Sequence, residues 1–294
     1  MATLLQILVV GMPIGVAYAA VALGFNVIYR SGRVFNIALG EMFALAAFFI
    51  MWLLNRGVPA WPAVGITGLL MIAVGLLIQR LALRPLLGQS ALSLFMATLG
   101  VLLLLNGADT LVLNTPTGTF PQLFGAGAIR LPYAVQLPVA SVVGVAVVVI
   151  IVLGFVAFFS RTQTGIAMTA VAEDHEVAQS LGINIERSLA LSWAMCGLLS
   201  TVAAVVYLAG QQVTSDIGSV AFLALPVVLL GGLESIGGVI LAGLVVGLGQ
   251  TSAAEWLDPH FHGGASEVFP YLLMLLILLV RPEGFFGWKR VERV

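Results

Sequence analysis

The sequence predicts an all-α protein that crosses a membrane about nine times, as a polytopic helical bundle with broken or re-entrant segments. Of its 294 residues, 61% are hydrophobic and 9% are charged, whereas about 25% of the residues of a typical soluble domain are charged. The mean hydropathy of +1.12 agrees with a membrane protein. Most apolar stretches are long enough to cross about 30 Å of hydrocarbon as a helix. We expect one transmembrane domain over residues 1–294, with eight to ten segments.

Nine stretches lack charged residues, apart from Glu41 in the second, and each is a candidate membrane segment. They run over residues 3–29, 37–54, 61–79, 91–106, 134–159, 188–209, 220–233, 236–254 and 268–280. The seventh and ninth are short, so re-entrant geometry is an alternative for them. Gly57 and Pro59 indicate a tight turn over residues 55–60, and several glycines and prolines indicate an irregular connection over residues 108–131.

Lysine and arginine residues predict the orientation of these segments. If the hydrophilic stretch 161–187 faces the cytoplasm, ten of the 12 basic residues share its side, and only Arg56 and Arg130 lie outside. Such a bias is the one that the positive-inside rule describes. With nine crossings the N-terminus lies outside and the C-terminus lies in the cytoplasm, whereas eight or ten crossings would move the N-terminus inside.

Other functional classes find little support in the sequence. The net charge is −1 and Lys289 is the single lysine, so we expect no nucleic-acid partner. His260 and His262 have no third ligand near them in the sequence, so we expect no metal site. There is no H-E-x-x-H, G-x-S-x-G or phosphate-binding G-x-x-x-x-G-K-[ST] motif. We therefore expect a protein that is not an enzyme and that holds no cofactor of its own.

The segment Gly165–Arg187 is the longest hydrophilic stretch on the side taken as cytoplasmic. Apolar residues recur there every three or four positions, which predicts an amphipathic helix over about residues 165–182. Gly182 can cap its C-terminus, and Asn184 can cap the next helix. Small residues on one face favour docking into a groove of a partner, because lipid binding would need basic and bulky aromatic residues. A solvated connector without a partner is the alternative.

Several motifs, in order along the chain, resemble those of one family. The letters E-V-A at residues 176–178, followed by Gly182, are similar to the coupling motif E-A-A-x-x-x-G of importer permeases that work with ATP-binding-cassette (ABC) ATPases. The N-I-A-L-G-E of residues 36–41 resembles the N-F-A-H-G-E of branched-chain amino acid permeases, with Leu39 in place of histidine. Further similarity lies in residues 172–176, 231–238 and 281–287. The resemblance to this permease family therefore spans nearly the whole chain.

This resemblance implies which residues couple the protein to an ATPase and which complex it joins. The implied coupling residues are Glu173, Asp174, Glu176, Ala178 and Gly182. The implied complex lies in the bacterial inner membrane and contains a second, similar permease subunit, two ABC ATPases that bind ATP and Mg²⁺, and a periplasmic binding protein. The implied cargo is a branched-chain or other small hydrophobic amino acid. Urea, short amides or aromatic acids are an alternative cargo, and an ATP-independent carrier or channel is a second alternative.

Glu41 has two interpretations, because it is the single charged side chain between residues 37 and 54. In the first, Asn36 caps the helix, Gly40 permits close approach of another backbone or of solute, and Glu41 faces the pore, with Leu39 as a further pore position. In the second, Glu41 is buried between helices, either hydrogen-bonded to free backbone donors or paired with Arg30 or Arg33, and it only stabilises the break in the helix. A second candidate for a broken helix contains Gly231, Gly232, Glu234, Gly237 and Gly238.

Overall fold

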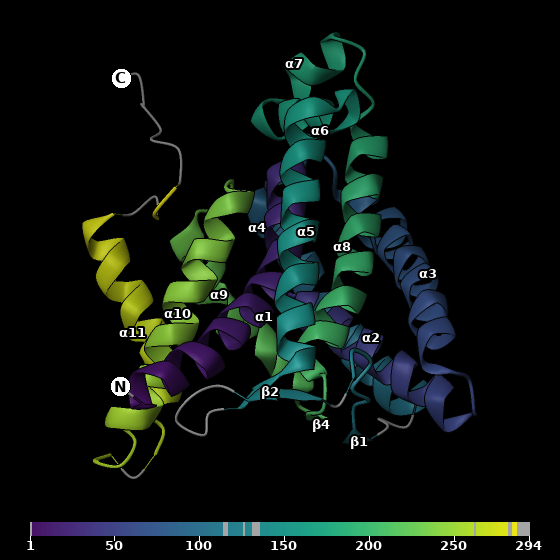
Figure 1. Cartoon of the computed structure of the whole chain (residues 1–294). Coiled ribbons are helices and arrows are strands. Elements are labelled where there is room, and N and C mark those ends of the chain that lie inside the picture. Colours follow the sequence, from purple (N-terminus) through teal and green to yellow (C-terminus); the bar gives the residue numbers. More distant parts are fainter. Residues whose placement is uncertain are drawn as a thin grey trace.

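The computed structural model describes residues 2–113, 117–125, 127–130, 136–261, 263–281 and 284–286, and it contains a bundle of apolar helices (Figure 1). Within these described residues, six helices are long and apolar enough to cross a membrane, and three apolar helices are shorter. The six are α1 (Ala2–Gly32), α3 (Ala60–Ile78), α4 (Ala91–Ala108), α5 (Val139–Arg161), α8 (Ile185–Leu208) and α10 (Ile236–Trp256). The shorter ones are α2 (Leu39–Asn55), α9 (Val220–Gly231) and α11 (Ala265–Val280). Each of these nine helices lies on one of the nine predicted segments.

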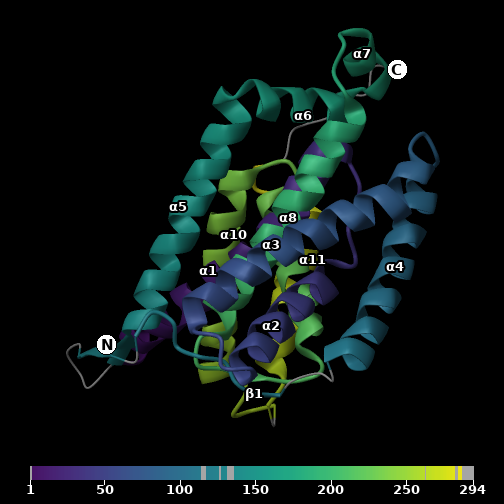
Figure 2. The ribbon, with the colours of Figure 1, turned by 90° about the vertical axis from the view of Figure 1, so that its right-hand side faces the viewer.

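Helix α1 forms the centre of the bundle and packs most extensively against α10 and α8. In its most apolar part, 67% of the α1 residues are buried, against 17% for α4 and 22% for α5, which lie at the outside (Figures 1 and 2). Helix α2 is short but central, with buried residues on all its faces. A helix that is apolar all round must be surrounded by protein or lipid, and α2 is surrounded by protein.

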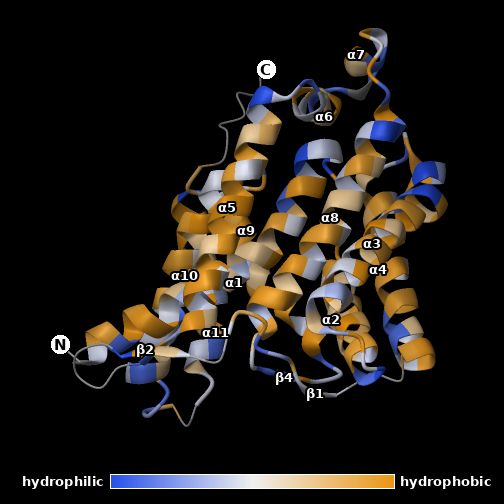
Figure 3. Ribbon diagram, turned by 45° about the vertical axis from the view of Figure 1, so that its right-hand side comes forward, coloured by the Kyte–Doolittle hydropathy of each residue, from blue (hydrophilic) through white to orange (hydrophobic). Residues whose placement is uncertain are grey.

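The two ends of the bundle carry the polar elements, as the hydropathy colours show (Figure 3). At one end, α6 (Gln163–Glu173) and α7 (His175–Ser180) join α5 to α8, and we name this the α6–α7 end (Figure 2). At the other end lie two antiparallel ladders. In these, β1 (Gly118–Thr119) pairs with β4 (Gln212–Val213), and β2 (Ala128–Arg130) pairs with β3 (Gln136–Pro138). The first residues of α1 lie at this β-ladder end (Figure 1).

Two helices continue beyond their predicted ends through wider turns. Helix α4 runs on through a π-helical turn, Asp109–Leu113, so the prediction of an irregular connection that begins at residue 108 was wrong. The charge of Asp109 ends the uncharged stretch but does not end the helix. Helix α3 continues through a π turn, Gln79–Leu83, and a 3₁₀ turn, Arg84–Leu86. Pro85 is tolerated at the start of this 3₁₀ turn, and the helix ends where Leu87 adopts an extended conformation with ψ 130°.

Four glycines bring the backbones of α1 and α10 into direct contact. A Cβ atom added at Gly15 would overlap the carbonyl oxygen of Gly243, and one added at Gly247 would overlap Gly15. A Cβ at Gly11 would lie 3.0 Å from the Cα of Leu248. Small residues spaced four apart permit this approach, and the close packing compensates for the lack of a hydrophobic driving force in lipid. The spacing Gly11/Gly15 and Gly243/Gly247 thus serves packing within one chain.

The glycine contact predicts that Gly15→Val destabilises the bundle, because the new side chain has no space between the two backbones. We expect a loss of about 1–3 kcal/mol or more, as overpacked cores show, measured as a lower melting temperature in detergent. Gly154→Val in α5 is the matched control, since a Cβ there meets open space. Equal melting temperatures for the two variants would contradict the packing described here.

Candidate functional site

The segment between α5 and α8 consists of two short helices, so the prediction of a single helix over residues 165–182 was wrong. Helix α6 ends at Glu173 because Asp174 adopts extended backbone angles, φ −153° and ψ 114°. The Asp174 carboxylate then accepts hydrogen bonds from the backbone N–H groups of Glu176 and Val177, at 2.9 and 3.0 Å. Aspartate is a preferred N-cap because its side chain satisfies free N–H groups at a helix start. Asp174 is therefore the hinge between α6 and α7.

The end of α7 is fixed by the caps that the sequence predicts. Gly182 has φ +81°. Its N–H donates to the carbonyl of Gln179, and the N–H of Ile183 donates to the carbonyl of Ala178, both at 3.0 Å. This is the hydrogen-bond pattern of a Schellman motif. The Asn184 side chain accepts from the backbone N–H of Arg187 at 2.9 Å and caps α8. The structure thus confirms the capping roles of Gly182 and Asn184.

Helix α7 presents both polar and apolar side chains at the α6–α7 end. Glu176 is exposed, and Val177 and Leu181 are 54% and 73% exposed. Ala178 is buried, with 1% of its surface exposed, so it holds α7 against the rest of the chain. Of the predicted coupling residues, Glu176 is thus accessible to another molecule, whereas Asp174, Ala178 and Gly182 shape the helix that presents it.

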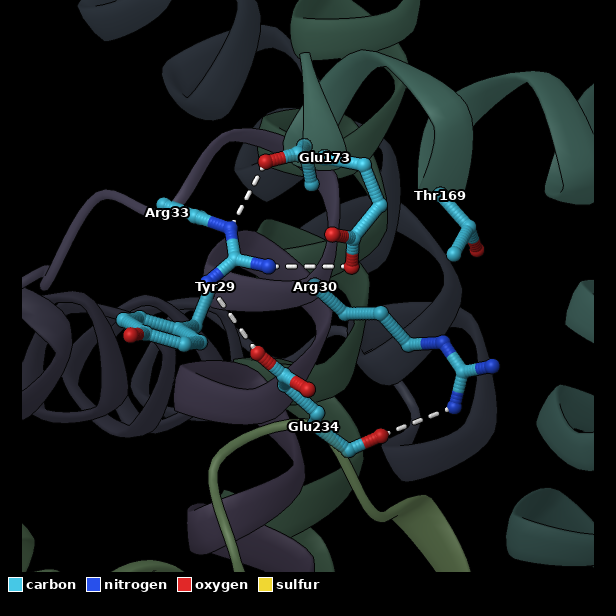
Figure 4. Close-up of a pocket in the computed structure, with 7 residues that line it drawn as sticks. Tyr29, Arg30, Arg33, Thr169, Glu173 and Glu234 are labelled. Carbon is cyan, nitrogen blue, oxygen red and sulfur yellow. Dashed lines mark hydrogen bonds and ion pairs between the residues drawn. The ribbon is translucent and has the colours of Figure 1, made fainter. Parts of the chain in front are cut away.

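Glu173, at the end of α6, belongs to a cluster of charged residues (Figure 4). The Arg33 guanidinium lies 2.9 Å from the Glu173 carboxylate and 3.2 Å from that of Glu234. Its Nε donates to the carbonyl of Ala172 at 2.7 Å. Arg30 Nη1 donates to the carbonyl of Glu234 at 2.9 Å. The cluster joins α1, α6 and the turn between α9 and α10.

The predicted broken-helix residues form that turn, which joins two separate helices. Gly232 ends α9 with φ +90°, and Ser235 caps α10 by accepting from the N–H of Gly238 at 3.0 Å. A Cβ added at Gly231 would lie 2.8 Å from the carbonyl carbon of Gly238, so the two helices touch through their backbones. A Cβ at Gly237 meets open space. The glycines therefore make a helical hairpin, and none of them interrupts a single continuous span.

Glu41 and Gly40 line a cavity of about 160 Å³ between α1, α2, α4 and α9. The Asn106 side chain donates to the Glu41 carboxylate at 3.4 Å. A Cβ added at Gly40 would overlap the carbonyl of Gly218, so Gly40 does permit close backbone approach. The other lining residues are mostly apolar: Phe25, Phe35, Ile37, Leu102, Asp216, Gly218, Ser219, Ala221, Phe222 and Leu225. The site therefore offers two carboxylates, those of Glu41 and Asp216, in a mostly apolar pocket.

The predicted partners of Glu41 lie elsewhere. Arg33 pairs with Glu173 and Glu234, and Arg30 bonds to the carbonyl of Glu234, so the prediction that Glu41 pairs with either arginine was wrong. Glu41 follows Arg30 and Arg33 by only 11 and 8 residues. However, Arg33 lies near α6 at one end of the bundle, and Glu41 faces Asn106 on α4. The half-buried carboxylate is bound by an amide and is open to the cavity.

Asn36 and Leu39 are buried away from the cavity. Helix α2 begins at Leu39 with Ala38 as its N-cap and without a side-chain cap, so the prediction that Asn36 caps it was wrong. Asn36 Nδ2 instead lies 3.6 Å from the sulfur of Met42. Leu39 packs against Gly24 on α1, where a Cβ would lie 2.6 Å from its Cδ1. These two side chains contribute to helix packing, whereas Gly40 and Glu41 line the cavity.

Sequence reasoning missed two carboxylates on the same side of the bundle. Asp216 lines the Glu41 cavity. Asp109 follows Asn106 by three residues, and it is 2% exposed with no hydrogen-bond partner for either carboxylate oxygen among the described protein residues. Buried ionisable groups are costly in a membrane. The available signal was the charge of Asp109 at the end of an apolar stretch, which marks the end of the uncharged residues but not the end of the helix.

Metal ligands do not converge in the part of the chain that the structure describes. No three His, Cys, Asp or Glu side chains there lie close enough to hold an ion. His262 lies outside the described residues, as do Pro282, Glu283 and Gly287 of the predicted C-terminal motif. Of that motif, the N–H of Phe285 donates to the carbonyl of Leu230 at 2.7 Å, so this segment rests on the end of α9.

A family model matches most of the chain. The family described as "Branched-chain amino acid transport system / permease component" matches residues 3–278. The high-affinity branched-chain amino acid transport system permease protein BraD of Pseudomonas aeruginosa is 29% identical, covering 99% of this chain and 98% of the relative. The corresponding LivH protein of Escherichia coli K12 is 28% identical, covering 97% and 96%.

A solved structure supports the fold. PsaBC from Streptococcus pneumoniae, in complex with Fab, aligns with a TM-score of 0.50 and 15% identity, covering 96% of this chain and 93% of that one. At this identity the likeness concerns the fold alone. Because the family match extends over residues 3–278 of 294, the chain belongs to the permease components of branched-chain amino acid transport systems.

Proposed function

We propose that this chain is the membrane-spanning permease subunit of an ABC importer. It moves branched-chain or other small hydrophobic amino acids into the cytoplasm, with ATP and Mg²⁺ bound by separate ATPase subunits. The observation that carries the proposal is helix α7, which stands at one end of the bundle with Glu176 exposed and both of its ends capped. The family membership and the relatives over their full length support the same function.

Two ATPases, a second permease subunit and a periplasmic binding protein complete the proposed importer. Helix α7 is the docking element for an ATPase, since Val177 and Leu181 supply exposed apolar surface beside Glu176. Apolar anchors on a short helix suit a groove of a folded partner. Because both of its ends are capped, α7 can move as a rigid body and transmit a movement of the ATPase to α6 and α8. Such rigid-body shifts open and close transporters.

The proposed orientation places the α6–α7 end in the cytoplasm of a bacterium and the β-ladder end in the periplasm. The multi-pass chain lies in the inner membrane. The first residues of α1 lie at the β-ladder end and α11 ends near the opposite side, so the N-terminus faces the periplasm and the C-terminus the cytoplasm (Figure 1). Arg33, Arg84 and Arg161 then flank the cytoplasmic side, in keeping with the positive-inside rule.

The Glu41 cavity is the proposed contact point for the cargo. Its phenylalanine, leucine and isoleucine walls suit an apolar side chain, and the Glu41 carboxylate suits the ammonium group of an amino acid. Urea and short amides would leave most of these apolar walls unused. Aromatic acids would place a second anion beside Glu41 unless they too carried an ammonium group. The cavity therefore favours a small hydrophobic amino acid.

Reconstitution tests the proposed class directly. The subunit alone in proteoliposomes should show no uptake of leucine, isoleucine or valine, whereas the complex with its ATPases and binding protein should accumulate them only with ATP. The separate ATPases are needed to use ATP because no G-x-x-x-x-G-K-[ST] phosphate-binding motif occurs in this sequence. Concentrative uptake by the isolated subunit would identify an ATP-independent carrier instead.

Glu176→Lys should abolish uptake by the complex while the protein stays folded. The reason is that the reversed charge lies on the exposed face proposed to dock the ATPase. Co-purification of the ATPase, ATP-driven uptake and melting temperature are the measurements. Glu186→Lys is the matched control, because Glu186 is half exposed on the same end of the bundle and its ion pair with Arg84 is a surface pair. Normal uptake with Glu176→Lys would remove the coupling assignment.

Glu41→Gln should weaken amino-acid uptake, because it removes the charge proposed to attract the ammonium group while keeping the shape. We expect about a tenfold loss of transport rate or affinity, the size of one charged hydrogen bond. Initial rates at varied leucine concentration measure it. Glu255→Gln, an exposed change near the end of α10, is the control. An unchanged uptake profile for Glu41→Gln would assign Glu41 to packing alone.

A further inference from the structure

Arg33 connects three segments that are far apart in the sequence (Figure 4). Its guanidinium pairs with Glu173 at 2.9 Å and with Glu234 at 3.2 Å, and its Nε donates to the carbonyl of Ala172 at 2.7 Å. Arg33 itself follows the last residue of α1. One side chain therefore joins α1, the end of α6 and the turn between α9 and α10.

The same turn is also held by two other side chains of α1. Arg30 Nη1 donates to the carbonyl of Glu234 at 2.9 Å, and Asn26 Nδ2 donates to the carbonyl of Leu233 at 3.0 Å. Asn26 and Arg30 are four residues apart in α1, so their side chains lie on one face of the helix, and Arg33 follows just after its end. Side chains of α1 thus donate hydrogen bonds to the backbone carbonyls that the turn leaves free.

Arg33 provides the polar connection between α6 and the α9–α10 turn. Within the described ranges, no hydrogen bond or ion pair joins α6 directly to that turn. The Arg33 and Glu234 side chains are 24% and 27% exposed, so water screens their attraction less than at an open surface. The planar guanidinium with several donors suits such a bridge, whereas lysine has a single charged atom.

The backbone of Arg33 is held in an unfavourable conformation. Its φ is +51°, and it is the one non-glycine residue with positive φ in the part of the chain that the structure describes. The left-handed region costs free energy for a residue with a Cβ, and such residues persist where the surrounding contacts determine them, often at functional sites. The side-chain contacts of Arg33 hold its backbone in this conformation.

The hairpin that Arg33 holds also forms a wall of the cavity. Helix α9 contributes Ala221, Phe222 and Leu225 to the Glu41 cavity, and it ends at the turn that contains Glu234. A continuous path of contacts therefore runs from α7 through α6, Arg33 and the turn to α9. Each step in this path is a helix or a polar contact described above.

We propose that Arg33 is a positioning residue that passes the movement of α6 to the α9–α10 hairpin, and so links the docking helix to the cargo cavity. This inference rests on the proposed function, since the movement comes from a partner ATPase. Its loss uncouples ATP hydrolysis from transport without preventing the ATPase from docking. A purely structural clamp would instead lower the stability of the bundle and leave the ratio of solute to ATP unchanged.

The test measures solute imported per ATP hydrolysed by the complete importer in proteoliposomes. Arg33→Asn removes the charge but keeps a residue that tolerates positive φ. We expect about a tenfold lower ratio for this variant, with the ATPase still co-purified and active, and a partial loss for Arg33→Lys. Arg84→Asn is the matched control, because it breaks one ion pair, with Glu186 at 2.9 Å, whose side chains are both 49% exposed. This control should keep the wild-type ratio.

The outcomes separate the inference from the proposed function. Wild-type complex that imports no solute with ATP would refute the proposed function. Wild-type transport together with an unchanged ratio for Arg33→Asn would overturn the role of Arg33 alone. Glu234→Gln is the second variant if Arg33→Asn does not fold, since it keeps the Arg33–Glu173 pair. A lower melting temperature of Glu234→Gln with an unchanged ratio would likewise overturn the inference.

Discussion

The arrangement of the chain depends on one constraint, that polar backbone groups must find partners inside the protein wherever a helix ends near lipid. The α9–α10 turn meets this constraint through α1, whose Asn26 and Arg30 donate to the carbonyls of Leu233 and Glu234. Arg33 does the same for Ala172 at the end of α6. Because the partners come from the central helix, the two polar connections are tied to the core and to each other. The charged residues in this part of the bundle are therefore part of its architecture.

The charged contacts and the apolar cavity lie at different places along the bundle. Charged pairs and capped turns gather at the α6–α7 end, whereas the Glu41 cavity is mostly apolar, with the carboxylates of Glu41 and Asp216 at its wall. An apolar solute needs few polar contacts on its path, and each buried charge raises the cost of the path. Glu41 and Asp109 are thus exceptions, and Asn106 donates a hydrogen bond to the carboxylate of Glu41. Helix α9 is the element that belongs to both regions.

Much of the fold could be predicted from the sequence because it depends on local patterns. Uncharged stretches located all nine apolar helices, and Gly182 and Asn184 marked caps that the structure confirms. The predictions of helix boundaries were wrong where one local sequence pattern is compatible with two structures. Asp174 fits a helix pattern by spacing, but its carboxylate favours a new helix start. The partner of Glu41, the orphaned Asp109 and the bridge made by Arg33 depend on contacts between distant segments, which one sequence does not display.

The glycine contact between α1 and α10 has a consequence for how the bundle can deform. The backbones of α1 and α10 touch without side chains between them, so changes of rotamer cannot let them slide past one another. We therefore expect the two helices to move as one rigid unit. The turn of the α9–α10 hairpin is bound to the same rigid unit. Any widening of the cavity then requires α1 and α10 to tilt together against α2 and α4, and the outer helix α4, whose most apolar part is 17% buried, gives way before the central α2.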